Sequence, residues 1–256
     1  MNILHNLPQK VGIFDSGIGG ISILKMMLSL NVSQIMYVAD TAFLPYGQKS
    51  SQILQTRGKV VTNLLIQQGI DTIIVACHTS SATSLEYLKK EFPNIRFIDM
   101  LFPTIKAASL ITKNKRVGVI ATEATIKSDA HKTLFKEHAS DIEVFTCATP
   151  ELVPFIENQK TESPECFFYL NTLLKTLLEK NIDTLILGCT HYPFIEHVIK
   201  KIAPQLQIVS AAGCIKNGNN KKEKDIMFLV SGNKKEFEKK IESFLKLKNP
   251  HIISFL

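Results

Sequence analysis

The chain has 256 residues, of which 45% are hydrophobic and 21% charged, with 12 glycines and 10 prolines. This length supports one large or two moderate cores, and the balanced composition excludes a fibrous or disordered chain. The amino terminus has no basic segment followed by an apolar run, and the longest apolar stretches are strand-sized. We therefore expect no secretion signal, no membrane span and a cytoplasmic location.

The formal charge of +7 would allow contact with nucleic acid. Much of the excess lies in a Lys-rich stretch from Lys216 to Lys248, which acidic residues interrupt and which contains few aromatic side chains. This pattern is typical of a solvated helix, so we expect no nucleic-acid partner.

Five cysteines occur, and they form neither a CxxC pair nor a Cys/His cluster with metal-ligand spacing; they are Cys77, Cys147, Cys166, Cys189 and Cys214. The spacing argues against zinc and against a disulfide framework. We therefore expect reduced thiols and no metal site.

Short apolar runs alternate with longer segments of helical period along the chain. In the first part, strands are expected at 11–15, 34–40 and 71–77, and helices at 21–30, 60–69 and 84–92. After Ile98 the alternation begins again, with strands expected at 116–122, 142–148 and 183–189 and helices at 124–138, 167–180 and 194–204. The alternation predicts an α/β protein with parallel sheets.

The second half of the chain repeats the first. The segment IDTIIVAC, 70–77, matches IDTLILGC, 182–189, at an offset of 112 residues, and KVGI, 10–13, matches RVGV, 116–119, at an offset of 106. Because both matches occur in the same order, we infer an internal duplication. It predicts two pseudo-symmetric, doubly wound parallel-sheet domains facing across a cleft: 1–98 plus 208–256, and 99–207.

Cys77 and Cys189 end the matched strands, each just before an expected helix. Open parallel sheets bind ligands at the carboxyl ends of their strands, and a helix N-terminus can lower a thiol pKa from its usual value of about 8.5. If the halves face each other, the two thiols meet one ligand from opposite sides. Inverting a carbon centre needs a base on one face and an acid on the other, so the pair predicts racemisation. Either cysteine alone would be interpreted as a small buried residue. Their matched positions in the two halves favour a catalytic role instead.

A nucleotide-binding α/β module is the first alternative, with Gly17-Ile18-Gly19-Gly20 as its phosphate loop. A dinucleotide fingerprint would have a third glycine where Ser22 stands, and no GK[ST] follows. A turn and close helix packing explain these glycines better.

Four segments carry a family resemblance: DSGIGG, 15–20; DTAFLPYG, 40–47; ACHTSSA, 76–82; and GCTHYP, 188–193. Together they resemble the motifs of glutamate racemases, and the resemblance covers nearly the whole chain. It implies interconversion of L- and D-glutamate for peptidoglycan synthesis, no cofactor such as pyridoxal phosphate, and a homodimer.

Residue by residue, the resemblance implies that Cys77 and Cys189 are the acid/base pair, with Cys77 deprotonating the D-enantiomer and Cys189 the L-enantiomer. Asp15 and His191 would each assist the thiol of their own half. The implied substrate-binding residues are Asp15, Ser16, Tyr46, Gly47, His78, Thr79, Thr190 and His191. Glu157 matches a family acid near the site, with a solvent-facing helix glutamate as the alternative.

Three residues depart from the family pattern. His78 stands where Asn is usual, Phe43 where Arg is common, and His131 where Tyr is common, while segment 209–220 replaces the usual return to the first domain. His78 keeps a second alternative open: a related enzyme acting on another substrate, such as an aspartate racemase or a decarboxylase, or a pseudoenzyme with weak turnover.

Overall fold

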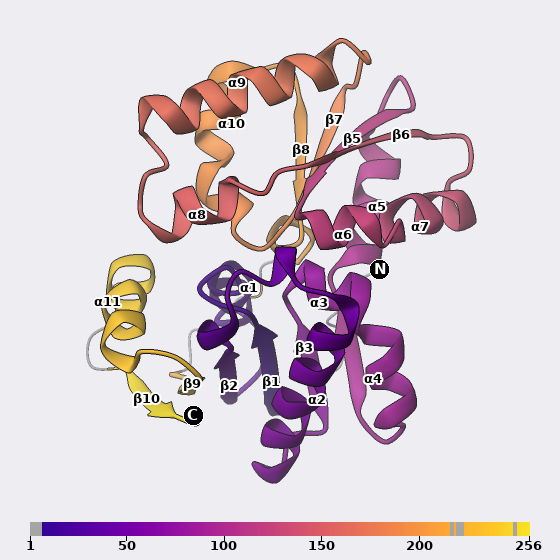
Figure 1. Cartoon of the computed structure of the whole chain (residues 1–256). Coiled ribbons are helices and arrows are strands. Elements are labelled where there is room, and N and C mark those ends of the chain that lie inside the picture. Colours follow the sequence, from indigo (N-terminus) through magenta and orange to yellow (C-terminus); the bar gives the residue numbers. More distant parts are fainter. Residues whose placement is uncertain (1–6, 216–217, 219–222, 248–249) are drawn as a thin grey trace.

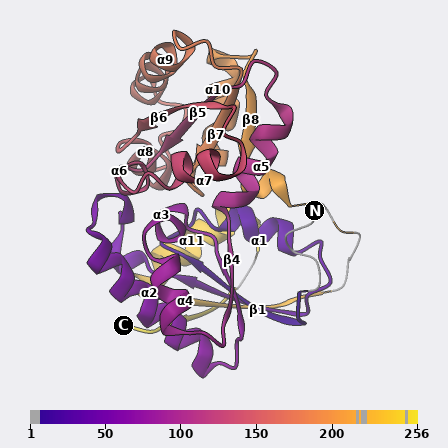
Figure 2. The same ribbon diagram turned by 90° about the vertical axis from the view of Figure 1, so that its right-hand side faces the viewer.

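The computed structural model describes residues 7–215, 218, 223–247 and 250–256, so segment 209–220 and the Lys-rich stretch lie partly outside the described residues. Two parallel sheets form two units, one above the other in Figure 1. Figure 2, turned by 90°, shows the same separation, with α3 (His78–Thr83) and α6 (Glu123–Lys127) at the junction. The carboxyl ends of both sheets therefore lead toward one interface.

The lower unit is built on six parallel strands in the order β10-β9-β2-β1-β3-β4. The strands are β1 (Lys10–Asp15), β2 (Gln34–Ala39), β3 (Thr72–Val75), β4 (Arg96–Asp99), β9 (Asp225–Val230) and β10 (His251–Ser254). All but the first residue of β1 are buried, as the continuous apolar run of a central strand requires.

Helices cover both faces of this sheet. Helices α1 (Ile21–Met27) and α11 (Lys234–Leu245) pack on one face, and α2 (Ser51–Gln67) and α4 (Leu85–Glu91) pack on the other. Phe237 and Ile241 are the buried face of α11, whose other side is solvated as predicted for this part of the Lys-rich stretch. Short 3-10 helices complete the unit: η1 (Thr41–Phe43), η2 (Tyr46–Gln48) and η4 (Ala212–Cys214).

The upper unit is built on four parallel strands in the order β6-β5-β7-β8. These are β5 (Arg116–Ala121), β6 (Glu143–Ala148), β7 (Thr184–Gly188) and β8 (Gln207–Ser210). One face is covered by α8 (Leu152–Glu157), α9 (Pro164–Leu178), η3 (Tyr192–Ile195) and α10 (Glu196–Ile202), and the other by α5 (Leu101–Ile111) and α7 (Ala130–His138). The order β6-β5-β7-β8 repeats β2-β1-β3-β4, so the duplicated α/β class is confirmed.

Several details differ from the sequence prediction; for example, α2 begins at Ser51 rather than at residue 60. The helix expected over 124–138 is two helices, because Asp129 takes a left-handed conformation with φ of 54° between α6 and α7. Strand β8 pairs with β7, so residues 208–210 lie in the upper sheet rather than in the first domain, where the predicted division placed them. We propose a division that follows the sheets, with the chain returning to the lower unit after Ser210.

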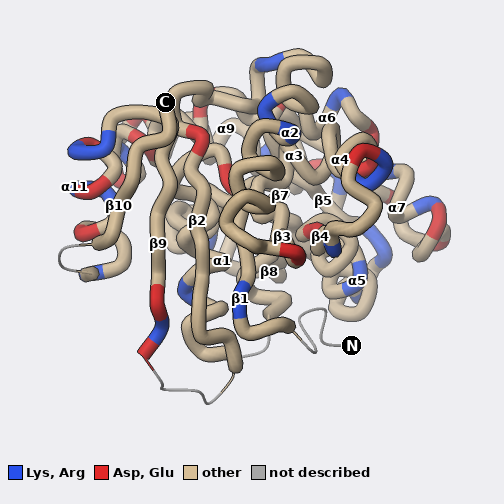
Figure 3. Tube along the Cα trace, turned by 90° about the horizontal axis from the view of Figure 1, so that it is seen from below, with Lys and Arg blue, Asp and Glu red and all other residues tan. Residues whose placement is uncertain are grey.

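Lys and Arg positions are interspersed with Asp and Glu positions along the outer helices, as the coloured Cα trace in Figure 3 shows. In the part of the chain that the structure describes, no helix is both long and apolar enough to cross a bilayer.

Candidate active site

Cys77 and Cys189 line the same small cavity between the two units. Cys77 follows β3 and caps α3, and Cys189 follows β7. The predicted site residues that share the cavity wall are Ser16, Tyr46, Gly47, Thr79, Thr190 and His191. The enclosed space is about 20 Å³, room for one water, whereas ligand pockets usually measure roughly 300 Å³ or more. The cavity must therefore widen to admit an amino acid.

The thiol of Cys77 is buried and donates a hydrogen bond to Oγ of Ser16 at 3.8 Å. Burial raises its pKa to about 12, and the charge of Asp15 adds to the effect. The prediction that a helix N-terminus lowers the pKa of this thiol is wrong, because desolvation of the thiolate outweighs the dipole of the six-residue helix α3. Cys77 is a protonated acid in this closed arrangement.

Asp15 lies behind the cavity and holds the two units together. Its Oδ1 accepts a hydrogen bond from the backbone N–H of Gly17 at 2.9 Å, and its Oδ2 accepts one from Oγ1 of Thr190 at 3.0 Å. Burial raises the pKa of this fully buried carboxyl, while the charge of His191 and these hydrogen bonds oppose the rise. Asp15 thus links the two units through a buried hydrogen bond.

Cys189 has a different neighbour from that of Cys77. Its Sγ lies 3.7 Å from Nδ1 of His191, whose Nε2 lies 2.7 Å from Oε1 of Glu157. Burial lowers the pKa of His191, but Cys189 and Glu157 outweigh it and hold the pKa well above 6.5. Burial also raises the pKa of Glu157, but His191 and Lys240 bring it down to about 2. Glu157 is therefore a buried anion that keeps a proton on the histidine beside Cys189.

Tyr46 lines the cavity, but its hydroxyl is engaged elsewhere. It donates to the carboxylate of Asp40, which also accepts two hydrogen bonds from Arg57 at 2.8 Å. The guanidinium of Arg57 lies 3.8 Å from the centre of the Phe43 ring, so Phe43 supports this buried pair. Tyr46 therefore fixes the loop that carries Gly47.

The loop glycines permit close approach of the two units. A Cβ on Gly47 would lie 2.5 Å from Cβ of Thr122, and one on Gly19 would lie 2.3 Å from Oγ1 of Thr190. Gly19 thus permits close packing, the interpretation that the sequence favoured over a phosphate loop for residues 17–20.

Thr122 is a cavity residue that the sequence prediction missed. It follows β5, lines the cavity, and its Oγ1 lies 2.9 Å from Oγ1 of Thr79 across the interface. A signal for it was present, because Thr122 stands 106 residues after Ser16, the same offset that relates β1 to β5. The duplication therefore predicts a hydroxyl at both positions.

His78 does not line the cavity. It is buried near His131, and in the described structure none of the four ring nitrogens of the two side chains has a hydrogen-bond partner. Burial lowers the pKa of His78 to about 3, with a contribution from His131, and that of His131 to about 4. Within the described ranges, no three His, Cys, Asp or Glu side chains are grouped to hold a metal ion. Two departures from the family pattern are thus buried imidazoles, one in each unit, whose lowered pKa values favour the neutral form.

Comparison with known proteins gives consistent similarities. The sequence pattern of the Asp/Glu/hydantoin racemase family matches residues 32–214. A glutamate racemase from Pseudomonas aeruginosa (strain UCBPP-PA14) is 39% identical over 204 residues, 79% of this chain and 77% of the relative. A crystal structure of a glutamate racemase isoform from Bacillus anthracis superposes with a TM-score of 0.87 at 28% identity, covering 96% of this chain and 97% of the other. One from Francisella tularensis, in complex with D-glutamate, superposes with a TM-score of 0.86 at 29% identity and the same coverage.

Proposed function

The chain belongs to the Asp/Glu/hydantoin racemase family and is an amino-acid racemase of the glutamate racemase kind, and we propose that Cys77 and Cys189 carry its chemistry. In this proposal the enzyme interconverts L- and D-glutamate and so supplies D-glutamate for peptidoglycan. One thiolate removes the α-proton, and the opposite thiol delivers a proton to the other face of the carbon. No cofactor takes part in the proposed mechanism.

The observation that carries the proposal is that both thiols line one enclosed cavity, one from each half of a duplicated fold. Enclosure excludes water, which an α-proton of very low acidity requires. The hydroxyls of Ser16 and Thr79 supply donors for an α-carboxylate. The cavity wall therefore offers both the transferring groups and the charge stabilisation that proton abstraction needs.

The two thiols differ in the resting arrangement. Burial keeps Cys77 protonated, whereas Cys189 faces a histidine whose pKa is raised and which can exchange a proton with it. In the form that would react with L-glutamate, Cys77 is a thiol and Cys189 is a thiolate paired with the imidazolium of His191. For D-glutamate, Cys77 must first lose its proton, and Asp15 is the neighbour placed to assist.

The test is exchange of the substrate α-proton in deuterium oxide, without added cofactor. Wild type should incorporate deuterium into L- and D-glutamate with inversion, and Cys77→Ser and Cys189→Ser should each lose inversion. Cys147→Ser is the matched control, because Cys147 lies half-buried on β6 and does not line the cavity. Inversion retained in either active-site variant would contradict the two-thiol mechanism.

Aspartate belongs in the same experiment because His78 replaces the usual asparagine beside Cys77. Faster exchange with L- and D-aspartate than with glutamate would assign the other substrate, and no exchange with any of the four would indicate a pseudoenzyme.

We also propose a cytoplasmic homodimer, which the family resemblance supports. Light scattering of the eluting peak in size-exclusion chromatography should give twice the mass of the chain, and the mass of one chain would contradict the dimer.

A further inference from the structure

We propose that Lys240 is a positioning residue for proton transfer at Cys189 and acts through Glu157 and His191. This inference rests on the proposed role of Cys189, and it assigns a function to the carboxyl-terminal helix that the two-thiol mechanism leaves without one.

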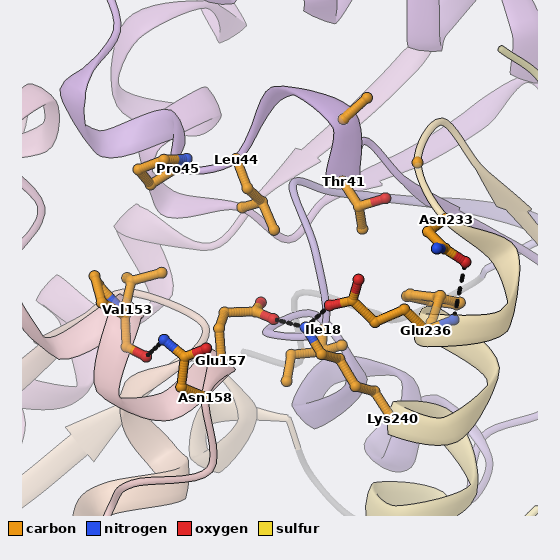
Figure 4. Close-up of a pocket in the computed structure, with 14 residues that line it drawn as sticks. Ile18, Thr41, Leu44, Pro45, Val153, Glu157, Asn158, Asn233, Glu236 and Lys240 are labelled. Atoms are coloured by element: carbon orange, nitrogen blue, oxygen red, sulfur yellow. Dashed lines mark hydrogen bonds and ion pairs between the residues drawn. The ribbon is translucent and has the colours of Figure 1, made fainter.

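Four side chains form one line of contacts leading away from the cavity. Sγ of Cys189 lies 3.7 Å from Nδ1 of His191, and Nε2 of His191 lies 2.7 Å from Oε1 of Glu157. The other carboxylate oxygen of Glu157, Oε2, accepts a hydrogen bond from Nζ of Lys240 at 2.8 Å. Figure 4 shows Lys240 reaching from α11 to a point between Glu157 and Glu236, and Oε1 of Glu236 lies 3.0 Å from the same ammonium.

The contact between Lys240 and Glu157 joins the two units. Helix α11 packs on the six-stranded sheet, and α8, which carries Glu157, packs on the four-stranded sheet. The pair lines a second cavity of about 380 Å³, which adjoins the thiol cavity through Leu44, Pro45 and Val153. The ion pair therefore depends on the closed arrangement of the units.

Burial strengthens the electrostatic interaction of Lys240 with Glu157. The side chains of Lys240 and Glu157 are only 18% and 13% exposed, so water screens their interaction less than it screens a surface pair. Removing the ammonium would leave one oxygen of a buried carboxylate without its partner, an arrangement that proteins avoid. Lys240 thus fixes both the charge and the orientation of Glu157.

The consequence for the site follows from the two oxygens of Glu157. Lys240 draws negative charge toward Oε2 and so weakens the hold of Oε1 on the proton of His191. His191 is then free to give that proton to a thiolate at Cys189 and to take it back. Without Lys240, Glu157 would hold the imidazolium proton more tightly. The pKa of His191 would rise, so His191 would lose its proton only at higher pH.

The experiment compares pH profiles of kcat/KM for D-glutamate, with which Cys189 delivers the proton, in wild type, Lys240→Met, Lys240→Arg and Lys239→Met. We expect Lys240→Met to move the basic limb of the profile, where His191 loses the proton that it supplies to Cys189, up by about 0.5–1 pH unit. Lys240→Arg should restore the wild-type limb. Lys239 is an exposed neighbour on α11, so Lys239→Met should match wild type. A Lys240→Met profile that matches wild type, or that falls uniformly without a shift, would overturn the proposal.

A second measurement does not depend on turnover. The rate of alkylation of Cys189 by iodoacetamide, followed by peptide mass spectrometry, should move along the pH axis in Lys240→Met and return in Lys240→Arg. If wild type fails to racemise either amino acid, the proposed function fails, and this profile still decides whether Lys240 acts on Cys189. Superimposable alkylation profiles would overturn the inference.

Discussion

Asp15 at the end of β1 accepts a 3.0 Å hydrogen bond from Thr190, so the carboxylate of one unit is held by the loop that carries the thiol of the other. The contact makes the geometry at Cys189 depend on closure of the cleft. Because the carboxyl group is fully buried, the hydroxyl of Thr190 is one of few groups available to stabilise its charge.

Replacing Thr190 by Val should lower kcat/KM by about 10- to 100-fold, the value of a hydrogen bond to a charged group. The hydroxyl lowers the pKa of Asp15, so its loss should also move the acidic limb of the pH profile to higher pH. Thr190→Ser keeps the donor and should retain both the rate and the limb. Equal losses in Val and Ser variants would show that the methyl group, not the hydroxyl, matters.

Gly19→Ala should reduce turnover by roughly 100-fold or more while the protein remains folded. The added Cβ would lie 2.3 Å from Oγ1 of Thr190 and 2.6 Å from Nδ1 of His191, so the cleft could not close fully. Steady-state kinetics together with circular dichroism would measure both effects. Gly213→Ala is the control, because its nearest neighbour would be the flexible Ser210 hydroxyl at 3.3 Å; a similar loss in that variant would argue against a specific effect at Gly19.

His78 and His131 should make the protein sensitive to acid. Burial lowers the pKa of each below the ordinary 6.5, so the unfolded chain binds more protons, and stability is lost as pH falls below about 6.5. Between pH 7 and pH 5 each histidine should cost about 2 kcal/mol of unfolding free energy. Urea denaturation at both pH values should show a smaller loss in the double variant His78→Asn with His131→Tyr. His138 is 49% exposed, so His138→Asn should behave as wild type; an unchanged acid loss in the double variant would contradict the assignment.

Arg57→Met should destabilise the fold by about 3–5 kcal/mol, because it leaves the carboxylate of Asp40 buried with Tyr46 as its remaining side-chain partner. The midpoint of urea unfolding measures the change. Lys59, two residues further along α2, forms an exposed pair with Glu91, and Lys59→Met should leave the midpoint unchanged. Similar midpoints for wild type and Arg57→Met would show that the buried pair adds no net stability.

The repeat in the sequence predicted much of this architecture for a physical reason. Cys77 and Cys189 follow the same apolar strand pattern, and equivalent strands in duplicated units end at equivalent places. The same reasoning extends to Ser16 and Thr122, whose hydroxyls both line the cavity. The apolar strand pattern and the offset between the two halves of the chain therefore predict which residues lie at the ends of strands.

Other features depend on contacts that no local pattern encodes. Lys240 and Glu157 are 83 positions apart and meet only because α11 and α8 pack on different sheets. The raised pKa of Cys77 follows from burial, which the short helix after it does not reveal. His78 follows Cys77 directly, yet it does not line the cavity and interacts electrostatically with His131. The sequence thus predicts where a residue lies along a strand or helix, whereas tertiary packing determines which groups its side chain contacts.

The sheet order also has a consequence for synthesis of the chain. Strands β5 to β8 are contiguous, so the upper sheet can close once Ser210 has left the ribosome, whereas β2 lacks its partner β9 until Val230 is made. A nascent chain at that stage already carries both thiols, Asp15 and His191, but not Lys240. Both cysteines thus precede, along the chain, the lysine that we propose tunes one of them.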